Sequence, residues 1–149
     1  MRTTQVECLV FRKNNNLFEF LLLKRIPKKG GFWQPITGGF EKKDNTLINT
    51  ALRELKEEAN IHPKDIQKTI EKVHYFEMTN HYLTNKPIAT IKEYVFAFEV
   101  KPNVKVKIDK NIYIEHEKIK WTSFEEAINL LKWNNNKIAL KKLNKILTN

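Results

Sequence analysis

The sequence predicts an α+β fold in which a mixed β-sheet is flanked by helices. Strand-like segments dominate the chain, one helical pattern interrupts them early, and two more come at the end. The 149 residues are enough for one domain with a substantial core. A hydrophobic content of 41% and a charged content of 30% are ordinary for a globular protein.

The first predicted elements are a hairpin and a short extended segment. Residues 5–11 and 17–24 are predicted strands, and a polar turn joins them. Residues 27–31 follow and contain proline and glycine, which interrupt regular structure. Pro35 disfavours a helix in the segment 32–35, so this segment is expected to be extended. Residues 36–39 end in two glycines, which predicts a glycine loop before the first helix.

The first helix is predicted from about Thr46 to the His62-Pro63 pair. An apolar stripe at helical spacing supports it, formed by Leu47, Ala51, Leu55 and Ala59. Asn45 or Asp44 is expected to cap its N-terminus, because short polar side chains accept hydrogen bonds from the first free amides of a helix.

The middle of the chain predicts more sheet. Long strands are expected at 66–78 and 88–100, separated by a polar loop. A lysine-rich turn region follows at 102–111, and a short strand at 119–121.

Two helices are predicted at the C-terminal end. Thr122 and Ser123 are each followed three residues later by a glutamate, which is the pattern of a capping box. This helix is expected to run to about Lys132, and the last helix to begin near Asn136. The apolar positions of the last helix are Ile138, Ala139, Leu143, Ile146 and Leu147.

Charge and cysteine content limit the partners and the compartment. The net charge is +10, but only four of the 27 basic residues are arginines, the rest being lysines. Proteins that recognise nucleic acid favour arginine, so composition bias explains the charge and nucleic acid is not an expected partner. Cys8 is the single cysteine, which excludes an intramolecular disulfide and favours a cytoplasmic location. Neither an apolar signal core nor a membrane-spanning run is present.

Three glutamates stand near the end of the first helix. Glu54, Glu57 and Glu58 lie at i, i+3 and i+4, on neighbouring faces of one turn. Like charges at this spacing are unfavourable, and carboxylates are better placed at the start of a helix. A solvated acidic face is one interpretation. A bound divalent cation is the other, because it would relieve the repulsion.

The segment from Gly38 to Ile61 resembles the Nudix box, the signature of the Nudix hydrolases. Its matching residues are Gly39, Arg53, Glu54, Leu55, Glu57, Glu58 and Ile61. Asn45 stands where the box has its first glutamate, and Asn60 where it has its last glycine. Asparagine tolerates the left-handed conformation that ends a helix. The missing glutamate predicts reduced or altered activity if that residue supports Arg53 or the metal.

The resemblance extends to the bacterial dATP and dihydroneopterin triphosphate pyrophosphohydrolases of this family. It rests on the segment 32–39, on Glu115-His116 and Lys120-Trp121, and on the segment 132–135. It implies one α/β/α sandwich domain over residues 1–149 that cleaves a nucleoside or pterin triphosphate into a monophosphate and pyrophosphate. A dinucleoside polyphosphate or nucleotide-sugar hydrolase is an alternative, and a catalytically weak Nudix-fold module that binds nucleotide or RNA is another.

The resemblance also implies a metal site and catalytic roles. The expected ligands are Glu54, Glu57, Glu58, the backbone carbonyl of Gly38 and Glu115, with Glu117, Glu93 and Glu77 as alternatives to Glu115. Mg²⁺ is the expected ion, with Mn²⁺ as an alternative. Glu54 is the candidate base, Glu57 shares the catalytic role, and Arg53 is expected to orient the carboxylates through charge-assisted hydrogen bonds.

The substrate is expected to be a small molecule, bound by a monomer or homodimer away from any membrane. Arg25 would face the phosphates, and Thr37 and Gly39 would line their path. Trp33, Phe76 and Tyr82 are candidate stacking faces for the base, although aromatic residues in a small domain also pack in the core. Asn134 would contact the base or cap the last helix. The four histidines, at 62, 74, 81 and 116, show no ligand spacing and are expected to be structural or exposed.

Overall fold

A computed structural model describes residues 3–109 and 113–149. Its strands are β1 (Thr4–Asn14), β2 (Leu17–Arg25), β3 (Trp33–Gln34), β4 (Ile36–Gly39), β5 (Ile66–Asn80), β6 (Pro87–Val100) and β7 (His116–Thr122). Its helices are α1 (Leu47–Ala59), α2 (Phe124–Leu130) and α3 (Asn134–Thr148), with 3₁₀ turns η1 (Pro27–Lys29), η2 (Lys42–Asp44) and η3 (Pro63–Asp65). Residues 1–2 of the N-terminus and residues 110–111 of the predicted lysine-rich turn lie outside the described residues.

Strand β1 is the centre of the sheet. It pairs in parallel with β6 on one side. On its other side it pairs antiparallel with β4 through its first half and with β2 through its last residues. β5 extends the sheet beside β6, and β3 and β7 lie beside β2. The sheet is therefore mixed, as predicted.

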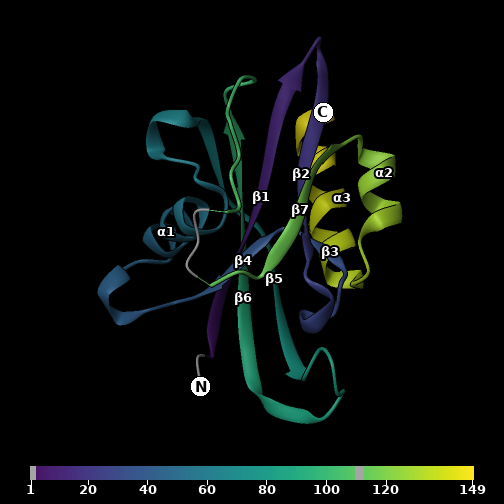
Figure 1. Ribbon diagram of the computed structural model, residues 1–149. Helices are drawn as coiled ribbons and strands as arrows, with labels where there is room; N and C mark the ends of the chain where they lie inside the picture. The colour runs from purple at the N-terminus through teal and green to yellow at the C-terminus, as the bar shows by residue number, and fades with distance from the viewer. Residues whose placement is uncertain (1–2, 110–112) are drawn as a thin grey trace.

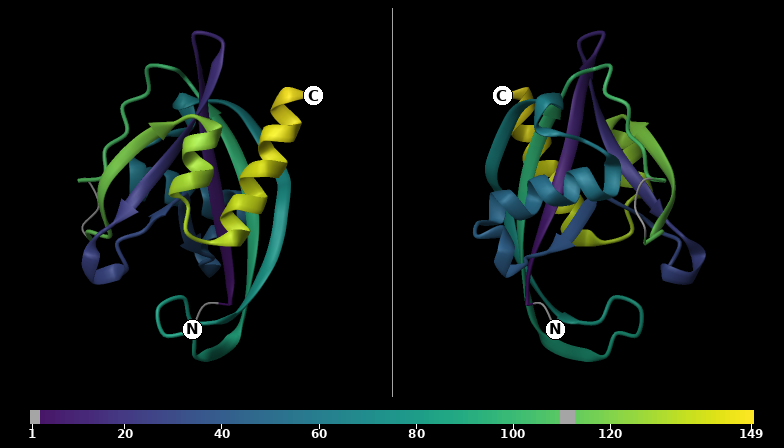
Figure 2. Two further views of the ribbon diagram at one scale, coloured as in Figure 1. Left: turned by 90° about the vertical axis from the view of Figure 1, so that its right-hand side faces the viewer. Right: turned by 60° about the vertical axis from the view of Figure 1, so that its left-hand side comes forward.

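Helices cover both faces of this sheet. Figures 1 and 2 show α1 across one face and α2 and α3 against the other, which is the expected α/β/α sandwich. Successive β1 side chains alternate between the faces. Val6, Cys8 and Val10 pack with Ala51, Leu55 and Ala59 of α1. Leu9 and Phe11 pack with Ala139, Leu140 and Leu143 of α3.

The ends of α1 agree only in part with the prediction. Thr46 is the N-cap, not Asn45 or Asp44, and its hydroxyl accepts a hydrogen bond from the Asn49 amide at 3.2 Å. Asn45, with a φ of 66°, ends the preceding 3₁₀ turn. At the other end Asn60 has a φ of 57° and a ψ of 33°, the left-handed cap that was expected.

Other element bounds shift by a few residues. Residues 36–39 form strand β4, because they pair with β1, and do not form a glycine loop. Ser123 caps α2 as predicted, but α2 ends at Leu130 and α3 begins at Asn134. The buried stripe of α3 follows Ala139, Leu140 and Leu143, so Ile146 lies at its border and is 46% exposed.

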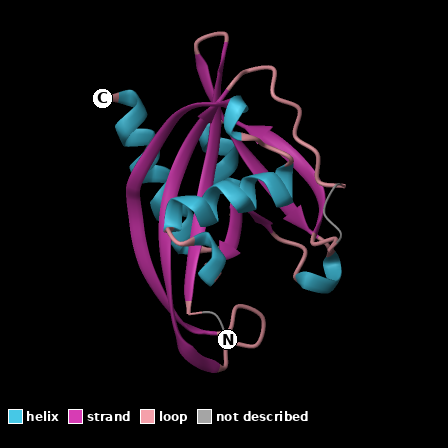
Figure 3. Ribbon diagram, turned by 90° about the vertical axis from the view of Figure 1, so that its left-hand side faces the viewer, coloured by secondary structure: helices cyan, strands magenta, loops and turns pink. Residues whose placement is uncertain are grey.

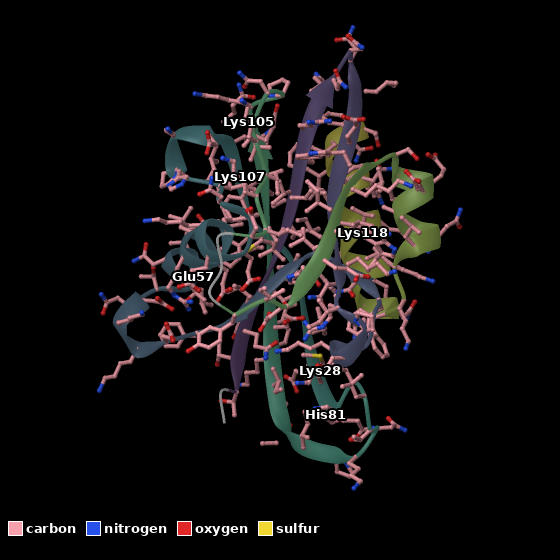
Figure 4. All side chains as sticks on the ribbon, in the orientation of Figure 1. Lys28, Glu57, His81, Lys105, Lys107 and Lys118 are labelled. Atoms are coloured by element: carbon pink, nitrogen blue, oxygen red, sulfur yellow. The ribbon has the colours of Figure 1, made fainter. Side chains whose placement is uncertain are left out.

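The described helices include none that is long and apolar enough to cross a membrane. Cys8 is buried with a free thiol. The lysines labelled in Figure 4 lie on separate parts of the chain: Lys28 on η1, Lys118 on β7, and Lys105 and Lys107 on the segment after β6.

Candidate active site

A cavity of about 1430 Å³ lies between α1, the β5–β6 hairpin and the first turn of α3. The hairpin extends past the other strands and forms one wall (Figure 3). Small-molecule sites usually measure about 300–1,000 Å³, so the space exceeds that of one compact ligand. The cavity brings together every predicted site residue except Trp33. These are Arg25, Thr37, Gly38, Gly39, Arg53, Glu54, Glu57, Glu58, Glu115 and Asn134.

Arg53 organises the α1 side of this cavity. Its guanidinium donates to both Asp44 oxygens, at 2.9 and 3.0 Å, and to the Gly39 carbonyl at 2.8 Å. It also donates to Glu54 Oε1 at 2.9 Å and to Glu57 Oε2 at 3.2 Å. All five guanidinium N–H groups thus have an acceptor. These are the contacts expected of a residue that orients carboxylates.

Asp44 supplies the acidic partner that Asn45 does not. Its carboxylate is buried and, besides Arg53, accepts from the Thr50 hydroxyl at 2.8 Å and the Glu41 amide at 2.9 Å. The hydrogen bonds from Arg53 hold the pKa of Asp44 well below its usual value. Arg53 is therefore supported by Asp44, which lies one residue before the box position that Asn45 occupies.

Gly38 leaves room for Glu54. A Cβ atom on Gly38 would lie 1.9 Å from Glu54 Cδ, so any side chain there would displace the carboxylate. Glu54 is only 6% exposed. Burial raises its pKa to about 7; Arg53 opposes this shift, and the charges of Glu57 and Glu58 add to it. Glu57 is more exposed and points from α1 as labelled in Figure 4.

Glu58 and Glu115 lie close together although they are far apart in the sequence. With His116 they form a cluster whose ligand atoms all lie within 4.8 Å of one another. His116 Nδ1 is 3.4 Å from Glu58 Oε2, and its Nε2 is 3.0 Å from Gln34 Nε2. With the Gln34 amide donating to Nε2, Nδ1 carries the ring proton and faces Glu58. Glu117, one of the alternatives to Glu115, instead pairs with Lys24 at 3.4 Å.

Aromatic rings and Arg25 form another wall. The Arg25 guanidinium lies over Phe32, at 5.6 Å from the ring centroid, and over Tyr82, at 5.5 Å. Phe32 also makes an edge contact with Trp133, with centroids 5.4 Å apart. Trp33, by contrast, is partly buried against the α2 and α3 core and does not line the cavity. Strand alternation turns Trp33 away and brings Phe32 into the cavity wall.

Several site residues escaped the sequence analysis. His116 is buried inside the carboxylate cluster, and Gln34 binds it. Asp44 was considered only as a cap. The N-cap of α3 is Trp133, with no capping side chain, so Asn134 is available to the cavity. The sequence gives one indication of this role of Asp44: it is an acidic residue one position before that of the box glutamate.

Comparison with known proteins identifies related chains. The family model described as the NUDIX domain matches residues 1–143. A structure from Listeria monocytogenes str. 4b F2365, provisionally identified as a NUDIX hydrolase, has a TM-score of 0.79 and 29% identity. That alignment covers 97% of this chain and 93% of the Listeria chain.

Two structures with named substrates are more distant. An Ap4A hydrolase of C. elegans has a TM-score of 0.77 at 22% identity, covering 97% of both chains. The E. coli dihydroneopterin triphosphate pyrophosphohydrolase has a TM-score of 0.68 at 23% identity, covering 95% of this chain and 94% of the other. At these identities the likeness shows the fold alone.

A curated relative matches part of the chain. It is named octanoyltransferase, from Myxococcus xanthus, and is 29% identical over 111 residues. The match covers 74% of this chain but only 28% of that protein. The chain thus spans less than a third of that relative, whose named activity belongs to the longer protein.

Proposed function

The chain belongs to the NUDIX domain family, and we propose that it is a pyrophosphohydrolase that cleaves a nucleoside or pterin triphosphate into a monophosphate and pyrophosphate with Mg²⁺. The observation that carries the proposal is the convergence of Glu58 and Glu115 with the Arg53-bound carboxylates at one cavity wall. Four carboxylates at one wall suit a polyphosphate only when a cation lies between them.

The donor set fits a hard divalent cation. Carboxylate and carbonyl oxygens are the ligands that Mg²⁺ and Mn²⁺ prefer. Glu54, Glu57, Glu58, Glu115 and the Gly38 carbonyl would hold it. His116 would act through Glu58, as an imidazole that orients a metal-bound carboxylate. When bound, the ion neutralises phosphate charge and lowers the pKa of a coordinated water.

The chain's own side chains would supply orientation and proton transfer. Arg53 holds Glu54 and Glu57 in place against their mutual repulsion. Burial raises the pKa of Glu54 to about 7 in the metal-free protein, and Glu54 is the candidate to accept a proton from water. Arg25 would neutralise phosphate oxygens from the opposite wall, and Thr37 and Gly39 would border the polyphosphate.

Two other functions remain as alternatives to this one. The cavity volume favours a dinucleoside polyphosphate as the second candidate, because two bases need more space than one. A catalytically weak binding module was suggested by Asn45, but Asp44 gives Arg53 an acidic partner and removes that argument. The buried free thiol of Cys8 supports a cytoplasmic location.

Product analysis with Mg²⁺ tests the proposal. The panel would contain nucleoside triphosphates, dihydroneopterin triphosphate, diadenosine polyphosphates and ADP-ribose. Pyrophosphate from a triphosphate supports the proposal, whereas two nucleotide products from a dinucleotide support the second candidate. The double variant Glu57→Gln, Glu58→Gln is the inactive reference, and Glu71→Gln, an exposed change on β5, is its control. Turnover no faster than that of the double variant would overturn the enzyme assignment to these substrates.

A further inference from the structure

Two carboxylates are buried on the sheet face opposite α1. Glu7 on β1 is 0% exposed and Glu93 on β6 is 3% exposed. β1 and β6 are parallel neighbours, with Glu7 opposite Val95 and Gln5 opposite Glu93. The two glutamates are therefore diagonal neighbours on the face that α3 covers. Neither belongs to the metal site described above.

Each of these carboxylates has one buried oxygen without a hydrogen-bond partner among the described residues. Asn136 Nδ2 donates to Glu7 Oε1. Glu7 Oε2 and Glu93 Oε1 have no hydrogen-bond partner among the described residues, and neither glutamate forms an ion pair there. Buried polar atoms almost always have a hydrogen-bond partner, and an unpaired one destabilises the folded protein. A packed core gains nothing from this arrangement, so it points to a ligand.

The surroundings identify the part of the substrate that would lie here. Glu93 lines the cavity beside Phe76, Met78 and Ile91, and the first turn of α3 faces it. Apolar walls around a buried acceptor suit a flat heterocycle, which is apolar on its faces and polar on its edge. Burial raises the pKa of Glu93 to about 8, and N–H donors on a bound base would favour its charged, accepting form. Arg25 also lines the cavity, and its charge suits it to phosphates rather than to the base.

We propose that Glu93, supported by Glu7 and Asn136, binds the base of the substrate and selects a base with two adjacent N–H donors. This inference rests on the proposed function and deepens it. A carboxylate accepts two parallel N–H bonds from such an edge. Guanine and the 2-amino-4-oxo pterin ring present a ring N–H beside an amino group. Adenine, cytosine and uracil place acceptors beside their donors.

The test compares GTP with ITP, which lacks only the 2-amino group. One charge-assisted hydrogen bond contributes about 1.5–3 kcal/mol, so kcat/KM for GTP should exceed that for ITP by about 10- to 100-fold. The variant Glu93→Gln should bring this ratio to within about threefold of one. Its turnover of ITP should fall less than its turnover of GTP, because ITP offers Glu93 one N–H donor and GTP offers two. Glu99→Gln, on the same face of β6 but outside the cavity, should leave the ratio unchanged.

The outcomes separate this inference from the proposed function. A wild-type ratio near one, a preference for ATP, or a ratio unchanged by Glu93→Gln would overturn the inference while turnover stands. If no triphosphate is hydrolysed, the proposed function fails. In that case calorimetry measures the dissociation constants of GDP and IDP. Tighter binding of GDP that Glu93→Gln removes supports the inference, and equal binding overturns it. Should Glu93→Gln fail to fold, Glu7→Gln takes its place and must lower the same ratio.

Discussion

Replacing Asp44 by asparagine removes the charge that holds Arg53. The carboxylate accepts four hydrogen bonds, two of them from the guanidinium at 2.9 and 3.0 Å. An asparagine keeps one acceptor oxygen and turns an amino group towards the other donors. Each charge-assisted bond contributes about 1.5–3 kcal/mol, so we expect Asp44→Asn to lower the free energy of unfolding by about 3 kcal/mol. For a domain of this size, that lowers Tm by about 6–12 °C.

Urea unfolding followed by tryptophan fluorescence measures this loss. Glu19→Gln is the matched control, since Glu19 binds Arg12 at 2.8 Å but both side chains are partly exposed. That change should cost less than about 1 kcal/mol. A loss for Asp44→Asn no larger than for Glu19→Gln would refute the role assigned to Asp44.

The pH dependence gives a second check. Arg53 holds the pKa of Asp44 below its unfolded value of 3.8. The stabilisation is therefore complete above about pH 4 and is lost as pH falls through the lower folded pKa. The difference between wild type and Asp44→Asn should be constant from about pH 7 to 5 and shrink towards about pH 2. A difference that persists unchanged in acid would contradict the reasoning.

Three further variants test neighbouring features. Asn45→Glu should not raise kcat/KM and should lower stability by about 1 kcal/mol, because position 45 has a φ of 66° and Arg53 has no spare donor; a tenfold gain in kcat/KM would contradict this. Gly38→Ala places a Cβ 1.9 Å from Glu54 Cδ, so Mg²⁺-dependent turnover should fall about tenfold or more while circular dichroism is retained; full activity would show that Glu54 can move freely. Burial raises the pKa of Glu93 to about 8, so the folded state loses stability as pH rises from about 4.5 through that value. Glu93→Gln should then be more stable than wild type at about pH 9 and equal to it near pH 4 in urea unfolding; equal stability at both would count against the shift.

Local pattern was enough for the fold class and for much of the site. The stripe of α1 and the spacing from Gly39 through Arg53 to Glu58 lie within one short segment. Side-chain periodicity and helix geometry determine which of these residues share a face, so no distant contact was needed to predict them. The left-handed cap at Asn60 followed from the same local rules.

The pairing and register of the strands could not be predicted from the sequence. His116 lies close to Glu58 because β7 pairs with β2 and because α1 lies across the sheet near that pair. The diagonal placement of Glu7 and Glu93 depends on the parallel register of β1 and β6. A shift of one residue in either register would turn these side chains to the other face.

The sequence by itself determined the family, the fold class, and the carboxylates of α1. Only the tertiary structure decided that Asp44 rather than Asn45 binds Arg53, and that Phe32 rather than Trp33 lines the cavity. The physical reason is the same in both cases. A choice between adjacent residues depends on backbone direction at one position, and contacts with distant strands and helices set that direction.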